Sequence, residues 1–182
     1  MNNLKSRRAF IVGLSSTKIT NKERHFLRKY KPWGVILFAR NIKSVDQTKK
    51  LTNDIKKIFK DSKYPILIDE EGGMVTRIRS IIDNSHFPAK YFGDNYKKDK
   101  TKSLLYLRTY IKQISHLLRY MGISINTVPV LDIPRPFTSK VIGTRAISKD
   151  INVINKIGEK TIEHFKEARI ATVIKHIPGH GL

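Results

Sequence analysis

The sequence predicts an α/β fold built on a parallel sheet. Two observations support this prediction, and a third bears on the kind of sheet. Short apolar runs recur along the 182 residues without the alternation of polar and apolar positions that is typical of a half-exposed strand. Amphipathic patterns separate these runs, so that strand and helix alternate. No G-x-G-x-x-G sequence follows the first run, which disfavours a dinucleotide-binding open sheet. An open doubly wound sheet and a (β/α)8 barrel both fit this order.

The five predicted strands are the apolar runs themselves. Each run is continuously apolar, which predicts that both of its faces are buried. In chain order they span residues 9–14, 34–38, 65–69, 125–132 and 170–176. A polar or glycine-containing segment follows each of them, as expected where a parallel strand gives way to a loop.

Helices are predicted between the strands from capping patterns and apolar spacing. Thr20-Asn-Lys-Glu23 and Ser44-Val-Asp-Gln47 both fit the capping box, in which the first residue caps the helix and the fourth reaches back to it. Apolar residues three or four apart predict two further helices, at 104–121 and 154–168. Gly122 stands where a glycine commonly ends a helix.

The rest of the chain shows no repeat beyond the strand–helix unit and no low-complexity tract. Residues 80–100 are expected to form a long connection with a Phe-Pro turn. We find no shift in composition that would mark a domain boundary, so residues 1–182 are expected to form a single domain.

Composition excludes several classes of function. The chain has no cysteine, which excludes disulfides, thiolate catalysis and cysteine-based metal sites. No apolar run approaches the ~20 residues of a membrane span, and the apolar run after the basic N-terminus is too short for a signal peptide. We therefore expect a cytoplasmic protein that does not bind membranes.

The net charge of +21, from 36 basic and 15 acidic residues, raises nucleic-acid binding as an alternative function. The lysines are spread singly and in pairs rather than gathered in a tail or an aromatic-rich patch, which is typical of solvated helix faces. We therefore expect no nucleic-acid partner and keep nucleic-acid binding only as the less favoured interpretation.

Ionisable and glycine residues follow four of the predicted strands at the same end. These segments are Ala39-Arg40-Asn41, Asp69–Gly73, Leu131-Asp132 and Lys175–His180. In a parallel barrel the carboxyl ends of the strands carry the active site. The sequence therefore predicts a polar site at this end of the sheet.

Each of these segments also has a simpler interpretation. The sequence of residues 69–73, Asp-Glu-Glu-Gly-Gly, could form a surface turn, although its adjacent carboxylates would need nearby cations such as Arg77 or Arg79. Asp69 directly ends an apolar run and is expected to be partly buried, and Glu71 could be purely structural. A lysine that closes an apolar strand, as Lys175 does, is costly to bury without a purpose.

A metal site is not predicted at the last of these segments. His176 and His180 are four residues apart, which on a helix would suit a metal ion. Pro178 and Gly179 lie between them and exclude a helix, so the spacing loses its meaning. We expect neither a metal ion nor a cofactor.

Five stretches in order make the sequence recognisable. It resembles glycoside hydrolase family 3, and within it the cytoplasmic bacterial β-N-acetylglucosaminidases that recycle peptidoglycan. The matching stretches are GVILFARNI (34–42), IDEEGGMVTRIR (68–79), NTVPVLDI (126–133), VIGTRAIS (141–148) and KHIPGHG (175–181). The resemblance implies a (β/α)8 barrel of the TIM type, of which residues 1–182 form the N-terminal part with about five β/α units.

The resemblance also implies the residues that bind substrate. The aspartate of the second stretch, Asp69, matches the residue that binds hydroxyls of the N-acetylglucosamine ring. Arg77, Arg145, Lys175 and His176 match the other substrate contacts. The implied substrate is a small amino sugar, the terminal β-N-acetylglucosamine of muropeptides, and the implied reaction is retaining hydrolysis without a cofactor.

The family's catalytic residues are not matched within the 182 residues. The resemblance places a histidine acid/base after the last stretch and an aspartate nucleophile later still, so both are expected C-terminal to Leu182. We therefore expect a truncated protein that holds the sugar-binding part and does not hydrolyse a glycoside alone. A non-catalytic remnant or an amino-sugar-binding module is the alternative.

An incomplete barrel would also expose its edges. The strands at 9–14 and 170–176 would lack neighbours on one side, which predicts aggregation, partial folding or assembly with a second chain that supplies the missing strands.

Overall fold

The computed structural model describes residues 7–180, in which five strands form one parallel sheet. The strands are β1 (Arg8–Gly13), β2 (Pro32–Leu37), β3 (Ile66–Ile68), β4 (Ile125–Asn126) and β5 (Ala171–Thr172). Their order in the sheet is their order in the chain, and every neighbouring pair is parallel. A doubly wound sheet reverses its strand order at a switch point, whereas a barrel does not. The observed order is therefore that of consecutive barrel strands.

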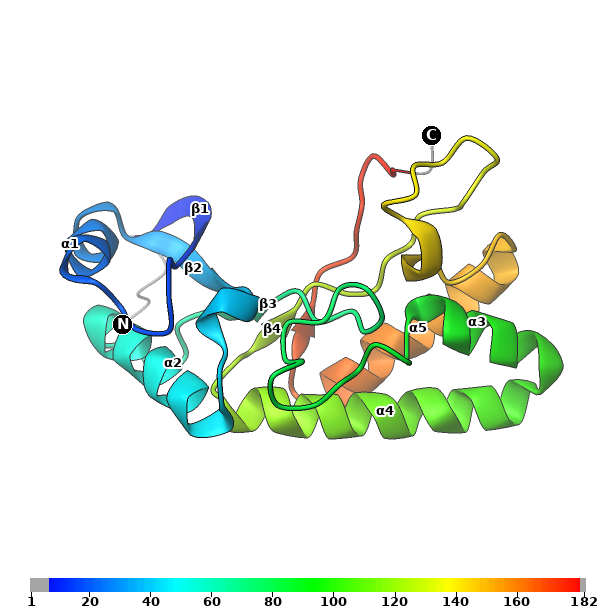
Figure 1. Cartoon of the computed structure of the whole chain (residues 1–182), viewed down its shortest axis with the longest axis horizontal. Helices are drawn as coiled ribbons and strands as arrows, with labels where there is room; N and C mark the ends of the chain where they lie inside the picture. The colour runs from blue at the N-terminus through cyan, green and yellow to red at the C-terminus, as the bar shows by residue number, and fades with distance from the viewer. Residues whose placement is uncertain (1–6, 181–182) are drawn as a thin grey trace.

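Five α-helices connect and cover the strands (Figure 1). They are α1 (Asn21–Tyr30), α2 (Val45–Phe59), α3 (Ala89–Lys98), α4 (Lys100–Tyr120) and α5 (Ile151–Glu167), with short 3-10 turns η2 (Ala39–Asn41) and η3 (Gly143–Arg145). In Figure 1 α4 runs along one long side of the molecule, and both α3 and α5 pack against it. Among the helices formed by residues 7–180, none is long and apolar enough to cross a membrane.

The predicted helix ends are largely confirmed. The capping box at Thr20 is complete: its hydroxyl accepts the amide N–H of Glu23, and the Glu23 carboxylate accepts the amide N–H of Thr20 at 2.8 Å. Ser44 caps α2, but the Gln47 side chain accepts from the amide of Lys43 instead of that of Ser44, and its NH2 group donates to the carbonyl oxygens of Thr17 and Asn41. The second capping box is therefore only half formed. Gly122 has a φ of +79° just after α4, as predicted.

Burial differs between the centre and the edges of the sheet. The three residues of β3 are almost completely buried, as the continuous apolar runs predict. At the two edges this expectation is wrong, because Ile11 of β1 is 45% exposed and Val173 and Ile174 after β5 are each 43% exposed. An edge strand has a neighbour on one side only, so its apolar side chains lack half of their packing partners.

The segment 80–100 contains α3, and its expected description as a connection is wrong over residues 89–98. The helix begins after Pro88 without a side-chain cap, and its buried face carries aromatic residues instead of the aliphatic spacing found in the other helices. Gly93 lies so close to the backbone at Ile147 that a Cβ atom there would lie 2.0 Å from the Ile147 carbonyl oxygen. A glycine inside a helix, which usually weakens the prediction, here permits close packing.

Gly93→Ala should lower the free energy of unfolding by about 1–3 kcal/mol, as measured by urea denaturation. Helix propensity alone would favour alanine by about 1 kcal/mol, but the clash with the Ile147 backbone forces α3 to move, and overpacking of this kind costs more. Lys97→Ala, on the exposed part of the same helix, should change stability by less than about 0.5 kcal/mol. A stabilised Gly93→Ala protein would contradict the close approach.

Candidate functional site

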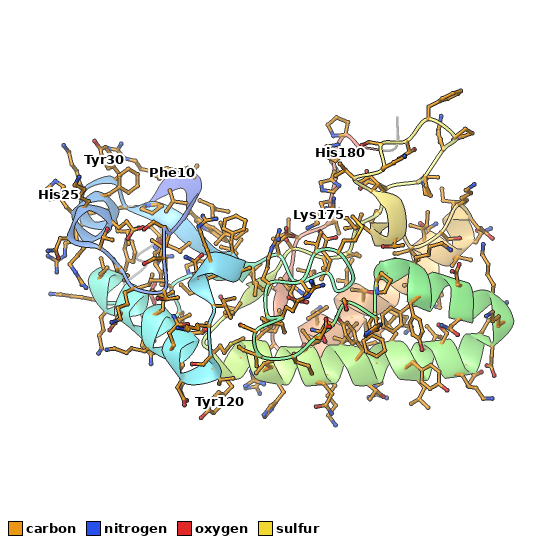
Figure 2. All side chains as sticks on the ribbon, viewed as in Figure 1. Phe10, His25, Tyr30, Tyr120, Lys175 and His180 are labelled. Carbon is orange, nitrogen blue, oxygen red and sulfur yellow. The ribbon has the colours of Figure 1, made fainter. Side chains whose placement is uncertain are left out.

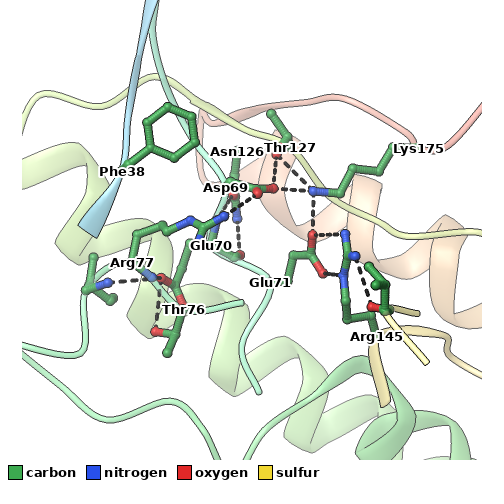
Figure 3. A network of polar contacts seen from close by, with 12 residues as sticks. Phe38, Asp69, Glu70, Glu71, Thr76, Arg77, Asn126, Thr127, Arg145 and Lys175 are labelled. Carbon is green, nitrogen blue, oxygen red and sulfur yellow. Dashed lines mark hydrogen bonds and ion pairs between the residues drawn. The ribbon is translucent and has the colours of Figure 1, made fainter. Parts of the chain in front are cut away.

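A network of ion pairs and hydrogen bonds joins residues that follow β3, β4 and β5 (Figure 3). Asp69 comes directly after β3, Thr127 after β4, and Lys175 three residues after β5. Because the strands are parallel, their carboxyl ends lie at the same edge of the sheet. The segment after β5 stays beside the one after β4, since the Leu131 amide donates to the Lys175 carbonyl oxygen at 2.7 Å.

Asp69 lies at the centre of the network. One carboxylate oxygen accepts from the Arg77 guanidinium at 2.8 Å, and the other accepts from the Thr127 hydroxyl at 2.6 Å and pairs with the Lys175 ammonium. Burial raises the pKa of Asp69, but hydrogen bonds from Lys175, Thr127 and Arg77 together with the Lys175 charge outweigh it and lower the pKa to about 2. Asp69 is therefore ionised at neutral pH and is partly buried, as expected.

Glu71 is the second anion of the network. Its carboxylate forms a two-pronged pair with Arg145, with Nε to Oε2 at 2.7 Å and Nη2 to Oε1 at 2.9 Å. The Lys175 ammonium lies 2.5 Å from Glu71 Oε1, so it bridges Asp69 and Glu71. The Glu71 side chain is only 3% exposed and that of Arg145 only 10%, which makes this a largely desolvated pair.

Glu70 points the other way and organises the loop that carries Arg77. One of its carboxylate oxygens accepts the amide N–H groups of Arg77 at 2.6 Å and of Ile78 at 3.2 Å, as well as the Thr76 hydroxyl. Burial raises the pKa of Glu70, and the hydrogen bonds from this loop only partly offset that effect. The backbone of Glu70 is held in turn by the Asn126 side chain, through bonds of 3.0 and 2.8 Å.

The turn after Glu71 requires its glycines. Gly72 has a φ of +78°, and a Cβ atom there would lie 2.3 Å from the Phe87 carbonyl oxygen. Residues other than glycine rarely adopt this conformation. Because Glu70 and Glu71 are buried, the alternative in which residues 69–73 form an exposed surface turn is wrong.

His176 lies beside the network rather than inside it. Its Nδ1 atom is 2.6 Å from Oδ2 of Asp132, a carboxylate whose side chain is fully buried, and its Nε2 atom is 3.5 Å from Arg145 Nη2. His180 packs edge-on against it with ring centroids 4.5 Å apart (Figure 2 labels Lys175 and His180 on this segment). Residues 177–180 are not helical, as Pro178 and Gly179 predict.

The structure thus brings together all five residues predicted to bind substrate, Asp69, Arg77, Arg145, Lys175 and His176. Of the two arginines considered as partners for the carboxylates, Arg77 joins the network, whereas Arg79 pairs with Asp83 on the surface. The pairing of Glu71 with Arg145 and the bond from Thr127 were not predicted. No local pattern signals them, because 74 and 58 residues separate the partners.

The site gathers charges of both signs. Four carboxylates, Asp69, Glu70, Glu71 and Asp132, lie at this edge of the sheet with three cations, Arg77, Arg145 and Lys175. The Nε–H group of Arg77 is buried without a hydrogen-bond partner. A site whose cations are matched by carboxylates, with a hydrogen-bond donor to spare, suits an uncharged, polar ligand. Among residues 7–180 a group that could hold a metal ion, Glu163, His164 and Glu167, lies away from this site, on α5.

Comparison with known proteins gives consistent matches. The model of the glycosyl hydrolase family 3 N-terminal domain matches residues 3–182. A β-hexosaminidase of Xanthomonas euvesicatoria pv. vesicatoria is 30% identical over 173 residues, which are 94% of this chain and 50% of that protein. A β-hexosaminidase of Hydrogenovibrio crunogenus is 31% identical over 172 residues, which are 94% of this chain and 47% of that protein.

The fold is also similar to solved structures. The crystal structure of NagZ from Neisseria gonorrhoeae in complex with N-trifluoroacetyl-D-glucosamine superposes with a TM-score of 0.85 at 25% identity. The match covers 97% of this chain and 52% of that one. The chain therefore spans about half the length of the curated relatives and of the solved structure that it matches.

Asp69→Asn should be less destabilising in acid than near neutrality. A carboxylate whose pKa falls from 3.8 to about 2 on folding stabilises the protein above pH 3.8, and this contribution is lost as the pH falls toward 2. The difference in unfolding free energy between wild type and variant should shrink by about 1–2 kcal/mol between pH 5 and pH 2. Parallel stability curves from chemical denaturation would show that Asp69 is not stabilised by its cations.

Proposed function

Because the chain belongs to glycosyl hydrolase family 3, as the match over residues 3–182 shows, we propose that its site binds the terminal β-N-acetylglucosamine of muropeptides. In this proposal the whole protein is a β-N-acetylhexosaminidase that hydrolyses this sugar with retention. Its setting is the cytoplasmic recycling of peptidoglycan, and its reaction needs no cofactor. Residues 1–182 act as one domain, the N-terminal part of the barrel.

One observation carries the proposal: Asp69, Arg77, Arg145 and Lys175 converge in one network of ion pairs at the carboxyl ends of the strands, with His176 beside it. Sugar hydroxyls are neutral and can both donate and accept hydrogen bonds, and charged partners bind them more strongly than neutral ones do. The NagZ of Neisseria gonorrhoeae, which has a similar fold, has been crystallised with an N-acylated glucosamine. An amino sugar therefore suits this site better than an anion does.

The same network bears on catalysis. A retaining glycosidase needs a nucleophilic carboxylate and an acid/base group on either side of the scissile bond. Among residues 7–180, the four carboxylates at this edge of the sheet are all engaged: Asp69 and Glu71 with cations, Glu70 with its loop, and Asp132 with His176. In our proposal the acid/base and the nucleophile come from outside these residues. Sugar binding without turnover is then the second candidate function of the 182-residue chain.

We also propose that a second chain covers the two edges of the sheet. Edge strands present unpaired backbone groups, and here Ile11 of β1 and Ile174, just after β5, add exposed apolar side chains at the two edges. The matched relatives are about twice as long as this chain, so strands that complete the barrel would have a counterpart in them.

Arg77→Lys should weaken N-acetylglucosamine binding by about 10–100-fold in isothermal titration calorimetry. Lysine keeps the charge but loses the planar group that both pairs with Asp69 and offers Nε–H to a ligand. A lost hydrogen bond to a charged group corresponds to about 1.5–3 kcal/mol, which gives this range. The matched control is Arg79→Lys, two residues along the chain, whose side chain pairs with Asp83 at the surface.

Equal weakening by both variants, or wild-type affinity for Arg77→Lys, would exclude the proposed sugar site. The same samples should show no hydrolysis of a chromogenic N-acetylglucosaminide above background, because the carboxylates described above are already engaged. Turnover that Asp69→Ala abolishes would instead show that the described residues contain the catalytic groups.

The purified protein should elute above its monomer mass of 21.0 kDa in size-exclusion chromatography with light scattering. Ile174→Lys should shift it toward the monomer, because a charge on an exposed edge opposes pairing with another strand. Ile82→Lys introduces the same charge at a similarly exposed residue in the segment between β3 and α3, away in the chain from β1 and from the segment that continues β5, and should leave the assembly unchanged. A cooperatively unfolding monomer with protected amides in both edge strands would contradict a partner chain.

A further inference from the structure

We propose that Asp132 is a positioning residue that holds His176 in the Nδ1–H tautomer, so that Nε2 faces the site as a hydrogen-bond acceptor. The identity of the ligand in this inference rests on the proposed function. The tautomer itself is a property of the unliganded protein and can be tested separately. The contact between Asp132 and His176 is separate from the ion pairs around Asp69.

The contacts of Asp132 fix which atom donates. Its Oδ2 atom lies 2.6 Å from His176 Nδ1, and its Oδ1 atom accepts the backbone N–H of His180 at 2.5 Å. Burial raises the pKa of Asp132, but the bonds from His176 and His180 outweigh it, so the pKa lies below its ordinary value. An ionised carboxylate only accepts hydrogen bonds, so Nδ1 of His176 must carry the proton.

The consequence appears at the other ring nitrogen. In an imidazole with its proton on Nδ1 alone, Nε2 carries a lone pair that can accept a hydrogen bond. This atom lies 3.5 Å from Arg145 Nη2, a long contact, beside the cations that surround Asp69 and Glu71. In this tautomer His176 therefore offers an acceptor nitrogen at the site.

Such an acceptor matters because the carboxylates are heavily used. Asp69 already accepts from Arg77, Thr127 and Lys175. Glu71 accepts two bonds from Arg145 and pairs with Lys175. A ligand hydroxyl needs an acceptor for its proton as well as donors for its oxygen, and Nε2 of His176 supplies that acceptor.

Asp132 also connects two parts of the chain. It follows β4, whereas His176 and His180 belong to the segment after β5, 44 and 48 residues later. In that segment Ile177 is 81% exposed, so apolar packing contributes little there. Through its two oxygens Asp132 therefore holds both the imidazole ring and the turn that follows it.

The test is the tautomer of His176, measured by two-bond ¹H–¹⁵N correlation spectra of the purified, unliganded protein at a pH where the ring is neutral. Wild type should show the Nδ1–H form. The two contacts of Asp132 use its two different oxygens, and in Asp132→Asn an NH2 group replaces one of them. With the amide oxygen kept on the backbone N–H of His180, the NH2 group faces Nδ1 of His176 and can donate to it. We expect His176 to move toward the Nε2–H form and N-acetylglucosamine affinity to fall about tenfold or more.

The matched control is Asp150→Asn, which makes the same change at the N-cap of α5 and should alter neither the tautomer nor the affinity. An Nε2–H tautomer in the wild type overturns the inference even if Asp132→Asn fails to fold. An unchanged tautomer in a folded Asp132→Asn protein overturns it as well. The predicted tautomer without any sugar binding would retain the positioning role and reject the proposed function instead.

Discussion

The site depends on one shared cation, the Lys175 ammonium between the carboxylates of Asp69 and Glu71. The two acids are close in sequence and repel each other, so each needs a positive charge nearby. Lys175 supplies it from the far end of the chain, 106 residues after Asp69. Its side chain is 15% exposed, and removal of one partner from a pair of this kind typically costs about 3–5 kcal/mol because the other charge stays buried.

The surrounding structure explains how this cation is kept in place. The backbone of Lys175 forms hydrogen bonds with the segment after β4. Asn126, the last residue of β4, binds the backbone of Glu70, which follows β3, through its side chain. Glu70 in turn holds the loop that aims Arg77 at Asp69. The three adjacent acidic residues therefore have separate tasks: Asp69 and Glu71 face the cations, and Glu70 supports the backbone of the loop that carries Arg77.

The sequence predicts what depends on short-range order. Continuous apolar runs locate the five strands, and the capping box at Thr20 locates the start of α1. Local order does not reveal α3, because its buried residues are aromatic and its glycine serves a contact with Ile147, 54 residues later. Local order also does not reveal the ion pair between Arg145 and Glu71, since only the folded sheet brings the two residues together.

Exposure at the edge strands could be predicted only from the resemblance, and not from the residues themselves. Ile11 and Ile174 belong to apolar runs that look like those of the buried strands. Their exposure is set by the absence of a neighbouring strand among residues 7–180, which is a property of topology and not of hydrophobic pattern.

The charge of the protein and the charge of its site are independent quantities. The chain carries a net charge of +21, yet around Asp69 and Asp132 three cations stand with four carboxylates. The excess of cations therefore lies on the rest of the molecule, where water and salt screen it within about 10 Å. Inside the network the charges are close and largely desolvated, so Asp69 and Glu71 are each matched by cations at hydrogen-bond distance. Recognition at the site is thus governed by hydrogen-bond geometry, even in a strongly basic protein.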